Sequence, residues 1–315
     1  MRITRRAAAM GVLALAARAA RAEPLGTGGE LLHVRPDWTS RITTPVYINR
    51  KGPFAFVVDT GANRSVVAAE LALELGLPPG RRAKIHGIQG LQDAATVDVQ
   101  SFTAGRLQLP IADVPILPRQ DLACDGFLGL DAFKSRRVEF DFRRGQVSIL
   151  AGGFEGLEAP GPVATLTSDV VVRARQRFGQ LTIAEAEVVG QRIGCFIDSG
   201  AQISVGNMAM RRILKAHTGD QGFAPLPIVL YGATGQQARG EVAEVPTLGV
   251  GALRFTDFNM SFADLHTFSL WGMQDRPAMM MGVDLLSLFA AVTVDFRQNA
   301  VRFRMAQAMA PDARS

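Results

Sequence analysis

Two segments of the chain that lie 139 residues apart have nearly the same sequence. Residues 54–67 read FAFVVDTGANRSVV and residues 193–206 read IGCFIDSGAQISVG. The matched pairs are Asp59 with Asp198, Thr60 with Ser199, Gly61 with Gly200, Ala62 with Ala201, Ser65 with Ser204 and Val66 with Val205. An internal repeat constrains the fold before local structure is considered, because two copies of one unit are expected to share one topology.

The correspondence continues through both halves, and the offset between matched residues only increases. It rises to 145 at two glycine-rich segments, to 153 at two Gly-x-Asp triplets and to 154 at two Asp-Phe-Arg triplets. The matched groups are Gly87-Ile88-Gln89-Gly90 with Gly232-Ala233-Thr234-Gly235, Gly129-Leu130-Asp131 with Gly282-Val283-Asp284, and Asp141-Phe142-Arg143 with Asp295-Phe296-Arg297. Matches that arise by chance would have scattered offsets, whereas a duplicated unit that later gained loop insertions produces a rising offset.

The repeat divides the chain into an N-terminal lobe, residues 23–150, and a C-terminal lobe, residues 180–315. Residues 151–179 between them begin with a stretch rich in glycine and proline and are predicted to be a linker. Each half consists mainly of extended apolar runs that flank turns. One helix is predicted in each half, over 66–75 and over 207–215. The sequence therefore predicts an all-β protein with two pseudo-symmetric lobes.

The first 22 residues have the features of an export signal. Arg2, Arg5 and Arg6 form a basic start, an alanine-rich stretch follows, and Ala20-Arg21-Ala22 offers small residues where a signal peptidase cuts. The apolar stretch is shorter than the roughly 20 residues that a membrane-spanning helix needs. The paired arginines resemble a twin-arginine signal; an ordinary secretory signal and an uncleaved, disordered N-terminus are the alternatives. We therefore expect an exported protein, periplasmic or secreted, without a stable membrane anchor.

The charge balance depends on this leader. The whole chain has 34 basic and 29 acidic side chains and a pI near 9.7, which by itself favours an acidic partner. Cleavage after Ala22 would remove five arginines and no acidic residue, so the mature chain would have a formal net charge of zero. A neutral chain lacks the basic surface of a nucleic-acid binder. We therefore expect no nucleic-acid partner.

The cysteines and histidines indicate no metal or redox cofactor. Cys124 and Cys195 each lie in an apolar run, so in an exported protein they could form a disulfide or remain buried thiols. The four histidines are far apart and lack the spacing of metal ligands. No cofactor and no metal are expected.

Each repeated segment places an aspartate at the end of an apolar strand, followed by a hydroxyl residue and a glycine. The glycine is expected to allow a positive φ and a close approach of the backbone. One such loop is weak evidence, because an aspartate after a strand is most often a turn residue. Two loops related by a pseudo-twofold axis could bring Asp59 and Asp198 face to face, where like charges force the pair to share one proton. Such a pair can activate a water and protonate a carbonyl oxygen, which is general acid–base hydrolysis of an amide.

With these motifs the sequence resembles the pepsin and retropepsin superfamily of aspartic peptidases, and each lobe is similar to bacterial retropepsin-type domains. The resemblance rests on the repeated loop and on the later strands Phe127-Leu128-Gly129 and Met280-Met281-Gly282, which in that family brace the aspartate loops. It implies two closed-barrel-like acid protease lobes with a central cleft, and a monomeric aspartic endopeptidase that acts on peptides or proteins. The implied catalytic pair is Asp59 and Asp198. The residues implied to support this pair are Thr60, Gly61, Ser199 and Gly200; in the family, the hydroxyl residue after each aspartate interlocks the two loops.

The resemblance also implies a glycine-rich hairpin, or flap, over the substrate. Segments 85–91 and 230–236 occupy the position of such a flap. The residues expected to contact substrate there are Gly87, Ile88, Gly90, Tyr231, Gly232 and Gly235. Retropepsins are dimers with one flap from each subunit, and pepsins are fused chains with one flap, whereas this chain is fused and has both segments. Whether one or both act is left open, and ordinary hairpin packing is the alternative for His86 and Tyr231.

Ala62 and Ala201 bear on the operating pH. In pepsins a serine follows the Asp-Thr-Gly triplet and its hydroxyl can stabilise the ionised aspartate, whereas alanine, as in retropepsins, removes that donor. The pKa of the ionised carboxyl should then be less depressed. We expect a pH optimum less acidic than that of pepsins, above about pH 3.

Two alternatives to a peptidase are open. A catalytically silent peptide-binding scaffold could keep the fold, although a degenerate copy would be expected to lose an aspartate or a glycine, and neither is lost. A paired-carboxylate hydrolase of another substrate is the second, because the pair sets the reaction and not the substrate. The insertion 263–280, which contains Trp271, could line the cleft or pack into its own lobe.

Overall fold

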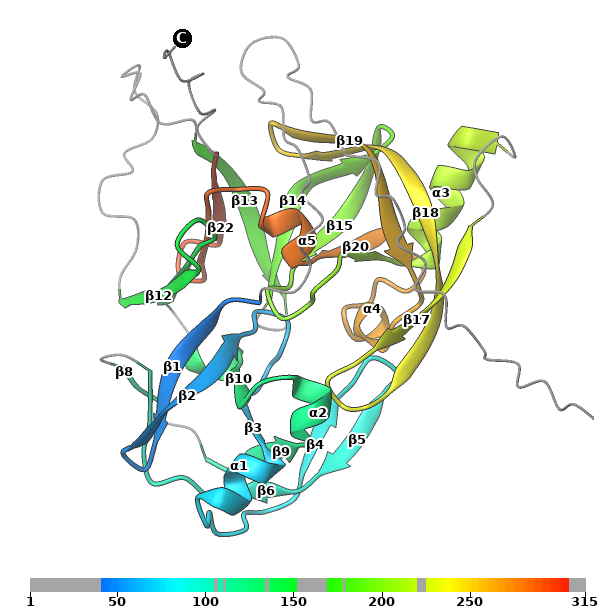
Figure 1. The fold of residues 1–315 in the computed structure, drawn as a ribbon. Coiled ribbons are helices and arrows are strands. Elements are labelled where there is room, and N and C mark those ends of the chain that lie inside the picture. Colours follow the sequence, from blue (N-terminus) through cyan, green and yellow to red (C-terminus); the bar gives the residue numbers. More distant parts are fainter. Residues whose placement is uncertain are drawn as a thin grey trace, which may run out of the picture.

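The computed structural model describes residues 41–104, 107–109, 112–133, 136–151, 169–177, 180–219 and 225–305. Within these residues the chain is an all-β protein with a few short helices, so the predicted fold class is confirmed. The first lobe is blue to cyan in the lower part of Figure 1, and the second lobe, green to orange, lies above it. The predicted leader, residues 1–22, and most of the predicted linker, residues 152–168, lie outside the described residues.

The first lobe is built on the hairpin of β1 and β2. Side chains of β1 alternate between exposed and buried, whereas the last three residues of β2 are all buried, because β2 lies between β1 and β10 inside the sheet. The strand order is β6-β9-β3-β10-β2-β1-β7-β8. The strand bounds are β1 (Thr43–Ile48), β2 (Lys51–Val58), β3 (Val66–Ala68), β6 (Thr96–Val97), β7 (Phe102–Ala104), β8 (Leu107–Leu109), β9 (Val114–Leu117) and β10 (Gly126–Leu128). The helical turns of this lobe are α1 (Ala69–Glu74), α2 (Arg119–Leu122) and the 3-10 turn η1 (Leu130–Ala132).

The second lobe contains a closed barrel of six described strands. Its order is β14-β15-β20-β16-β19-β18, and β18 pairs back to β14, so the backbone groups at both edges find partners. The strand bounds are β14 (Gln180–Val188), β15 (Gln191–Ile197), β16 (Val205–Gly206), β18 (Gln237–Val250), β19 (Leu253–Phe262) and β20 (Ala278–Met281). The helices of this lobe are α3 (Met208–Thr218), α4 (His266–Leu270) and α5 (Val283–Leu286).

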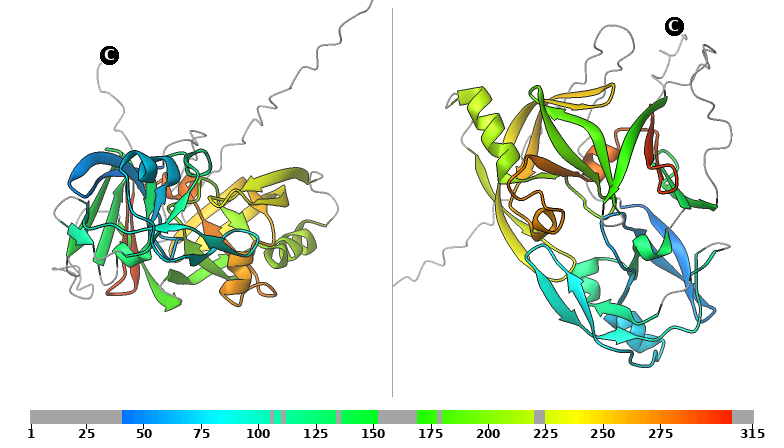
Figure 2. Two further views of the ribbon diagram at one scale, coloured as in Figure 1. Left: turned by 90° about the horizontal axis from the view of Figure 1, so that it is seen from below. Right: turned by 180° about the vertical axis from the view of Figure 1, so that it is seen from behind.

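One hairpin extends from each lobe. In the first lobe β4 (Ala83–His86) pairs with β5 (Leu91–Ala94), and we refer to them as the first hairpin. In the second lobe β18 continues beyond the barrel to pair with β17 (Leu226–Tyr231), and these two form the second hairpin. The cyan and yellow hairpins lie side by side in Figure 1 and in the view from behind in Figure 2.

Strands from both halves form one sheet that joins the lobes. β11 (Arg136–Asp141) and β12 (Gln146–Ala151) come from the first half, and β11 pairs with β21 (Ala291–Asp295) of the second. The sheet continues through β22 (Ala300–Arg304) to β13 (Asp169–Arg177). This sheet ties the two lobes together, because its register fixes β11 against β21 residue by residue.

The structure corrects part of the predicted linker 151–179. Asp169–Arg177 form β13, in which Val172 and Ala174 are buried and the residues between them are exposed. This alternation is typical of a strand. The linker prediction was extended over this strand because the residues before it are rich in glycine and proline. The helix predicted over 66–75 is also shorter, because the β-branched Val66 and Val67 belong to β3 and α1 begins at Ala69.

The insertion 263–280 packs mainly into its own lobe. Trp271 is 1% exposed, and its ring stacks on Phe196 with centroids 3.7 Å apart. Cys124 and Cys195 are both free thiols, and burial raises the pKa of the Cys195 thiol to about 12. In the part of the chain that the structure describes, no helix has the length and hydrophobicity to span a membrane.

Candidate active site

Asp59 and Asp198 occupy equivalent places at the ends of β2 and β15. The Asp59 N–H donates to the Leu128 carbonyl (2.8 Å), and the Asp198 N–H donates to the Met281 carbonyl (3.0 Å). These bonds continue the parallel pairing of β2 with β10 and of β15 with β20. The predicted bracing strands therefore hold both aspartate loops by the same backbone contact.

Each carboxyl group lies against the loop of the other lobe. A Cβ on Gly61 would be 2.4 Å from the carboxyl carbon of Asp198, and a Cβ on Gly200 would be 2.3 Å from that of Asp59. Only glycine leaves room for this approach at either position. Neither glycine has a positive φ, so the expectation of a left-handed conformation there is wrong. The close approach alone requires glycine.

Each aspartate is oriented by its own loop. Oδ1 of Asp59 accepts hydrogen bonds from the N–H groups of Gly61 (2.8 Å) and Ala62 (2.9 Å). Oδ1 of Asp198 accepts the equivalent bonds from Gly200 (3.0 Å) and Ala201 (3.1 Å). The backbone of each loop therefore fixes one oxygen of its own aspartate in the same way in both lobes.

Thr60 and Ser199 interlock the two loops, as the resemblance implied. The Thr60 N–H donates to Ser199 Oγ and the Ser199 N–H donates to Thr60 Oγ1, both at 3.1 Å. The Thr60 hydroxyl donates to the Ile197 carbonyl (2.9 Å), and the Ser199 hydroxyl donates to the Val58 carbonyl (2.7 Å). Both side chains are buried. These reciprocal bonds fix the distance between the lobes at the aspartates.

Removing one of these hydroxyls should destabilise the protein. In Thr60→Val the shape is kept, but the Ser199 N–H and the Ile197 carbonyl lose their partner in a buried place. We expect the free energy of unfolding to fall by about 2–4 kcal/mol, since each unsatisfied buried group costs about 1–3 kcal/mol. Urea unfolding measures this loss. Thr103→Val is the matched control, because its hydroxyl makes only one long bond, to the Tyr47 carbonyl (3.5 Å); equal losses in both variants would contradict the interlocking role.

A second pair of contacts braces the loops from behind. Ser65 Oγ accepts a bond from the Gly129 N–H (3.0 Å) and donates to Asp131 (2.7 Å). Ser204 repeats this arrangement with the N–H of Gly282 (2.9 Å) and with Asp284 (2.6 Å). Asp131 and Asp284 lie in the first turns of η1 and α5, where Gly129 and Gly282 hold the N-cap positions. The signal was present in the sequence, because both serines and both aspartates belong to the repeat.

Burial raises the pKa of both aspartates. Burial, followed by the charge of Asp198, raises the pKa of Asp59 from 3.8 to about 8. The N–H groups of Ala62 and Gly61 and the charge of Arg41 act in the opposite direction on this pKa. Burial also raises the pKa of Asp198. Such an environment disfavours the simultaneous ionisation of both carboxyl groups.

A cavity of about 570 Å³ lies between the lobes over the aspartate pair, and both hairpins line it. Of the six predicted flap residues, the ones that line the cavity are Gly87, Ile88, Tyr231 and Gly232. The other two, Gly90 and Gly235, are turn residues with φ of 151° and 74°. Both segments therefore lie at the cavity, and the action of one or both as flaps stays a prediction.

The first hairpin contacts the second hairpin and α4. The Gln89 N–H donates to Gln236 Oε1 (2.8 Å), and the Gln89 side-chain amide donates to the Gln237 carbonyl. The Ile88 carbonyl accepts a bond from the His266 N–H (2.8 Å). His86, for which hairpin packing was the alternative, stacks on His266 with ring nitrogens 3.1 Å apart, and it also lines the cavity.

Sequence reasoning missed several residues that line the cavity. They include Arg41, Arg64, Lys84 and Asp121 from the first lobe and Ile203 and Val229 from the second, whereas Leu265, Thr267 and Leu270 belong to the insertion 263–280, for which lining of the cleft was one of two alternatives. Arg64 and Ile203 could have been found, because each lies two residues after the alanine of the repeated loop. Asp121 could not, because the short helix α2 brings it to the cavity from far along the chain.

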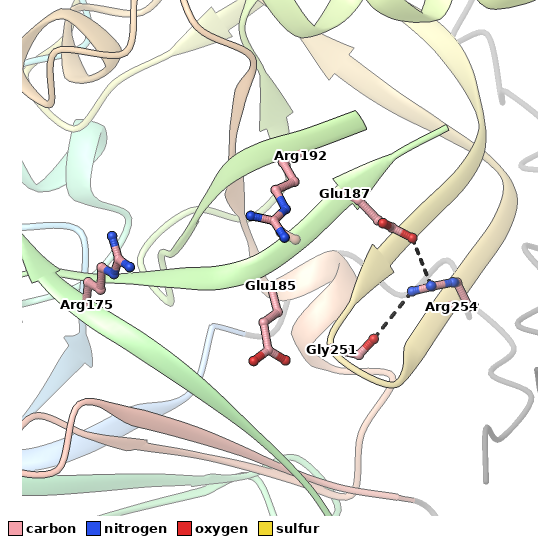
Figure 3. Close-up of a pocket in the computed structure, with 7 residues that line it drawn as sticks. Arg175, Glu185, Glu187, Arg192, Gly251 and Arg254 are labelled. Carbon is pink, nitrogen blue, oxygen red and sulfur yellow. Dashed lines mark hydrogen bonds and ion pairs between the residues drawn. The ribbon is translucent and has the colours of Figure 1, made fainter. Parts of the chain in front are cut away.

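A second hollow, of about 380 Å³, lies on the outside of the second-lobe barrel and shares no lining residue with the first (Figure 3). Charged side chains from neighbouring strands line it. Arg254 makes an ion pair with Glu187 (2.8 Å) and a hydrogen bond with the Gly251 carbonyl (3.4 Å). Because no residue of the repeated aspartate loops is among its lining residues, we do not consider it a candidate active site.

Comparison with known protein families found a match that lies in the first lobe. Residues 44–135 match the family model of the gag-polyprotein putative aspartyl protease. The matched segment includes Asp59, the first hairpin and the bracing strand β10. A search among curated proteins found no match. The match supports a retropepsin-like aspartyl protease domain in the first lobe, within the retropepsin and pepsin superfamily of aspartic peptidases.

Proposed function

We propose that the protein is an aspartic endopeptidase whose catalytic residues are Asp59 and Asp198, and that it hydrolyses peptide bonds in the cleft between its lobes. The observation that carries the proposal is the reciprocal approach of each carboxyl group to the glycine of the opposite loop. With the interlocked hydroxyls beneath them, the two carboxyl groups are held by the same contacts from either side. A pair that shares one proton is the arrangement that acid–base hydrolysis of an amide requires.

The proposed reaction begins with one ionised and one protonated carboxyl group. The ionised group takes a proton from a water, the water oxygen attacks the peptide carbonyl carbon, and the protonated group donates its proton to the carbonyl oxygen. The resulting tetrahedral diol collapses when a proton passes to the amide nitrogen and the C–N bond breaks. One water is consumed, and the pair ends with one proton as it began. No covalent bond forms between enzyme and substrate.

The two hairpins are proposed to cover an extended peptide. Their exposed backbone offers hydrogen bonds to a peptide strand, and the side chains that line the cavity offer pockets for alternate substrate residues. Because the hairpin tips touch each other through Gln89 and Gln236, substrate entry requires them to separate. Closure over the bound peptide excludes bulk water from the pair.

Digestion of a peptide library by the purified protein tests this proposal. We expect internal cleavage that is blocked by a statine-type transition-state analogue and absent in the Asp59→Asn variant. Removal of only terminal residues would contradict the endopeptidase assignment. Cleavage that persists in the variant would reject the aspartate pair. Peptide binding without turnover by the wild type would favour the catalytically silent scaffold.

A further inference from the structure

We infer that the two sides of the cleft select different side chains, an acidic residue on the side of the first lobe and an apolar residue on the side of the second. The preferred substrate is therefore a peptide with aspartate or glutamate on one side of the cleaved bond and an aliphatic or aromatic residue on the other. The inference rests on the proposed function, because it describes the specificity of the same cleft.

The first observation is that equivalent positions around the aspartate pair differ in chemistry. Arg64 and Ile203 are equivalent by the repeat, and the structure places them equivalently. A Cβ on Gly129 would be 2.5 Å from the Arg64 carbonyl carbon, and a Cβ on Gly282 would be 2.6 Å from the Ile203 carbonyl carbon. Both residues line the cavity. The same backbone position is thus held by an arginine on one side of the cavity and by an isoleucine on the other.

The hairpins repeat this difference. Lys84 and Val229 each lie three residues before the first glycine of their hairpin, and both line the cavity. The ammonium group of Lys84 is 3.9 Å from Asp93, and the side chains are 68% and 59% exposed. An exposed pair at that distance contributes little, so the lysine can turn to a substrate carboxylate at small cost. Val229 offers no such group.

The charged residues that line the whole cavity show the same difference between the lobes as these two pairs of positions. Apart from Asp198, no acidic or basic residue among those that line the cavity comes from the second lobe. The first lobe contributes Arg41, Arg64 and Lys84 against Asp121, besides Asp59. The first-lobe wall is therefore positive, and the second-lobe wall is uncharged apart from Asp198 and mostly aliphatic.

Arg64 is held in place by backbone carbonyl groups near the Asp113 carboxylate, whose pKa its charge helps to lower after the larger effect of Arg81. Its Nη2 donates to the backbone carbonyls of Asp113 (2.7 Å) and Ala112 (3.3 Å). The carboxylate of Asp113 is instead paired with Arg81 (2.7 Å). A guanidinium has five N–H donors, so a fixed Arg64 can still bind a substrate carboxylate. At the second-lobe wall, by contrast, a carboxylate would lose water without gaining a positively charged partner, and Asp198 would repel it, which disfavours it.

Paired peptides that differ only in Glu against Gln at one position test the inference. We expect the wild type to prefer Glu about tenfold or more on one side of the cleaved bond, as a charge-assisted hydrogen bond allows. On the other side Glu should be rejected in favour of leucine. The double variant Arg64→Ile, Lys84→Val should bring the ratio of kcat/KM for the Glu and Gln peptides close to one, since the charged contact is removed.

Arg82→Val is the matched control, because it removes a positive charge near Lys84 at an exposed residue that does not line the cavity. It should keep the Glu preference. Equal cleavage of Glu and Gln peptides by the wild type, or a preference that survives the double variant, would overturn the inference and leave the peptidase proposal standing.

Binding measurements keep the inference testable even if no cleavage is found. The Asp198→Asn variant should bind the Glu peptides about tenfold more tightly than the Gln peptides, for the same electrostatic reason. The same variant with Arg64→Ile and Lys84→Val should bind both alike. Equal affinity of the first variant for both peptides would reject the selective wall, whereas the absence of turnover in the wild type would reject only the proposed function.

Discussion

Changing Asp59 to asparagine is expected to lower kcat for peptide hydrolysis by about a thousandfold or more, because a positioned general acid–base group contributes about 10²–10⁴. Asparagine has nearly the same shape, and its Oδ1 can still accept the loop bonds from Gly61 and Ala62. It cannot exchange a proton with water or with the substrate carbonyl. KM should therefore change little while kcat collapses, which steady-state kinetics on one peptide separates.

The same change should stabilise the protein above acidic pH. Because the pKa of Asp59 is raised from 3.8 to about 8, the folded state holds this proton more tightly than the unfolded state does. The stability linked to it is fully present below about pH 4 and is lost as the pH rises through about 8. Asparagine does not titrate, so the variant should gain on the order of a few kcal/mol relative to the wild type across this range.

Thermal unfolding of both proteins at about pH 4 and about pH 8 measures the effect, with the two melting temperatures diverging as the pH rises. Asp93→Asn is the control, because its carboxyl group is exposed on the first hairpin; it should leave both activity and the pH dependence of stability unchanged. Activity of Asp59→Asn within tenfold of the wild type, or melting temperatures that stay parallel, would contradict a shared proton at this site.

Changing Gly200 to alanine is expected to abolish activity and to weaken the association of the lobes. The added Cβ would lie 2.3 Å from the Asp59 carboxyl carbon. Neither side can retreat easily, because the interlocked Thr60 and Ser199 hold the loops together from below. The Asp59 carboxyl group must leave its position, or the loops must part. We expect hydrolysis to become undetectable and the free energy of unfolding to fall by about 1–3 kcal/mol, the range for overpacking.

Gly194→Ala provides the matched control on the same strand. Gly194 lies on β15, and a Cβ there would meet its nearest neighbour, the Met273 methyl group, at 3.4 Å, which is an ordinary contact. Activity and unfolding in urea should both stay close to the wild type. Retention of substantial activity by Gly200→Ala would show that the carboxyl groups do not lie as close as the structure places them.

Much of the fold could be predicted because the two halves of the chain repeat one sequence pattern and can be compared with each other. Each aspartate, each glycine and each bracing strand has a counterpart at a steadily increasing offset, so a weak motif in one half was supported by the other. Period-two burial in strands such as β1 supported the all-β assignment. Where the two halves differ, or where neighbouring glycine and proline dominate, prediction failed, as for β13 inside the expected linker.

The sequence by itself determined that two equivalent Asp-Thr/Ser-Gly loops exist and that the fold is all-β, because local patterns and repeats depend only on the order of the residues. Only the tertiary structure decided that each carboxyl group rests against the opposite glycine, that Ser65 and Ser204 brace the loops through Asp131 and Asp284, and that both hairpins meet over the cavity. It also placed every charge that lines the cavity, apart from Asp198, on the first lobe. These properties depend on which distant residues become neighbours, and that is settled by packing between the lobes rather than by any local pattern.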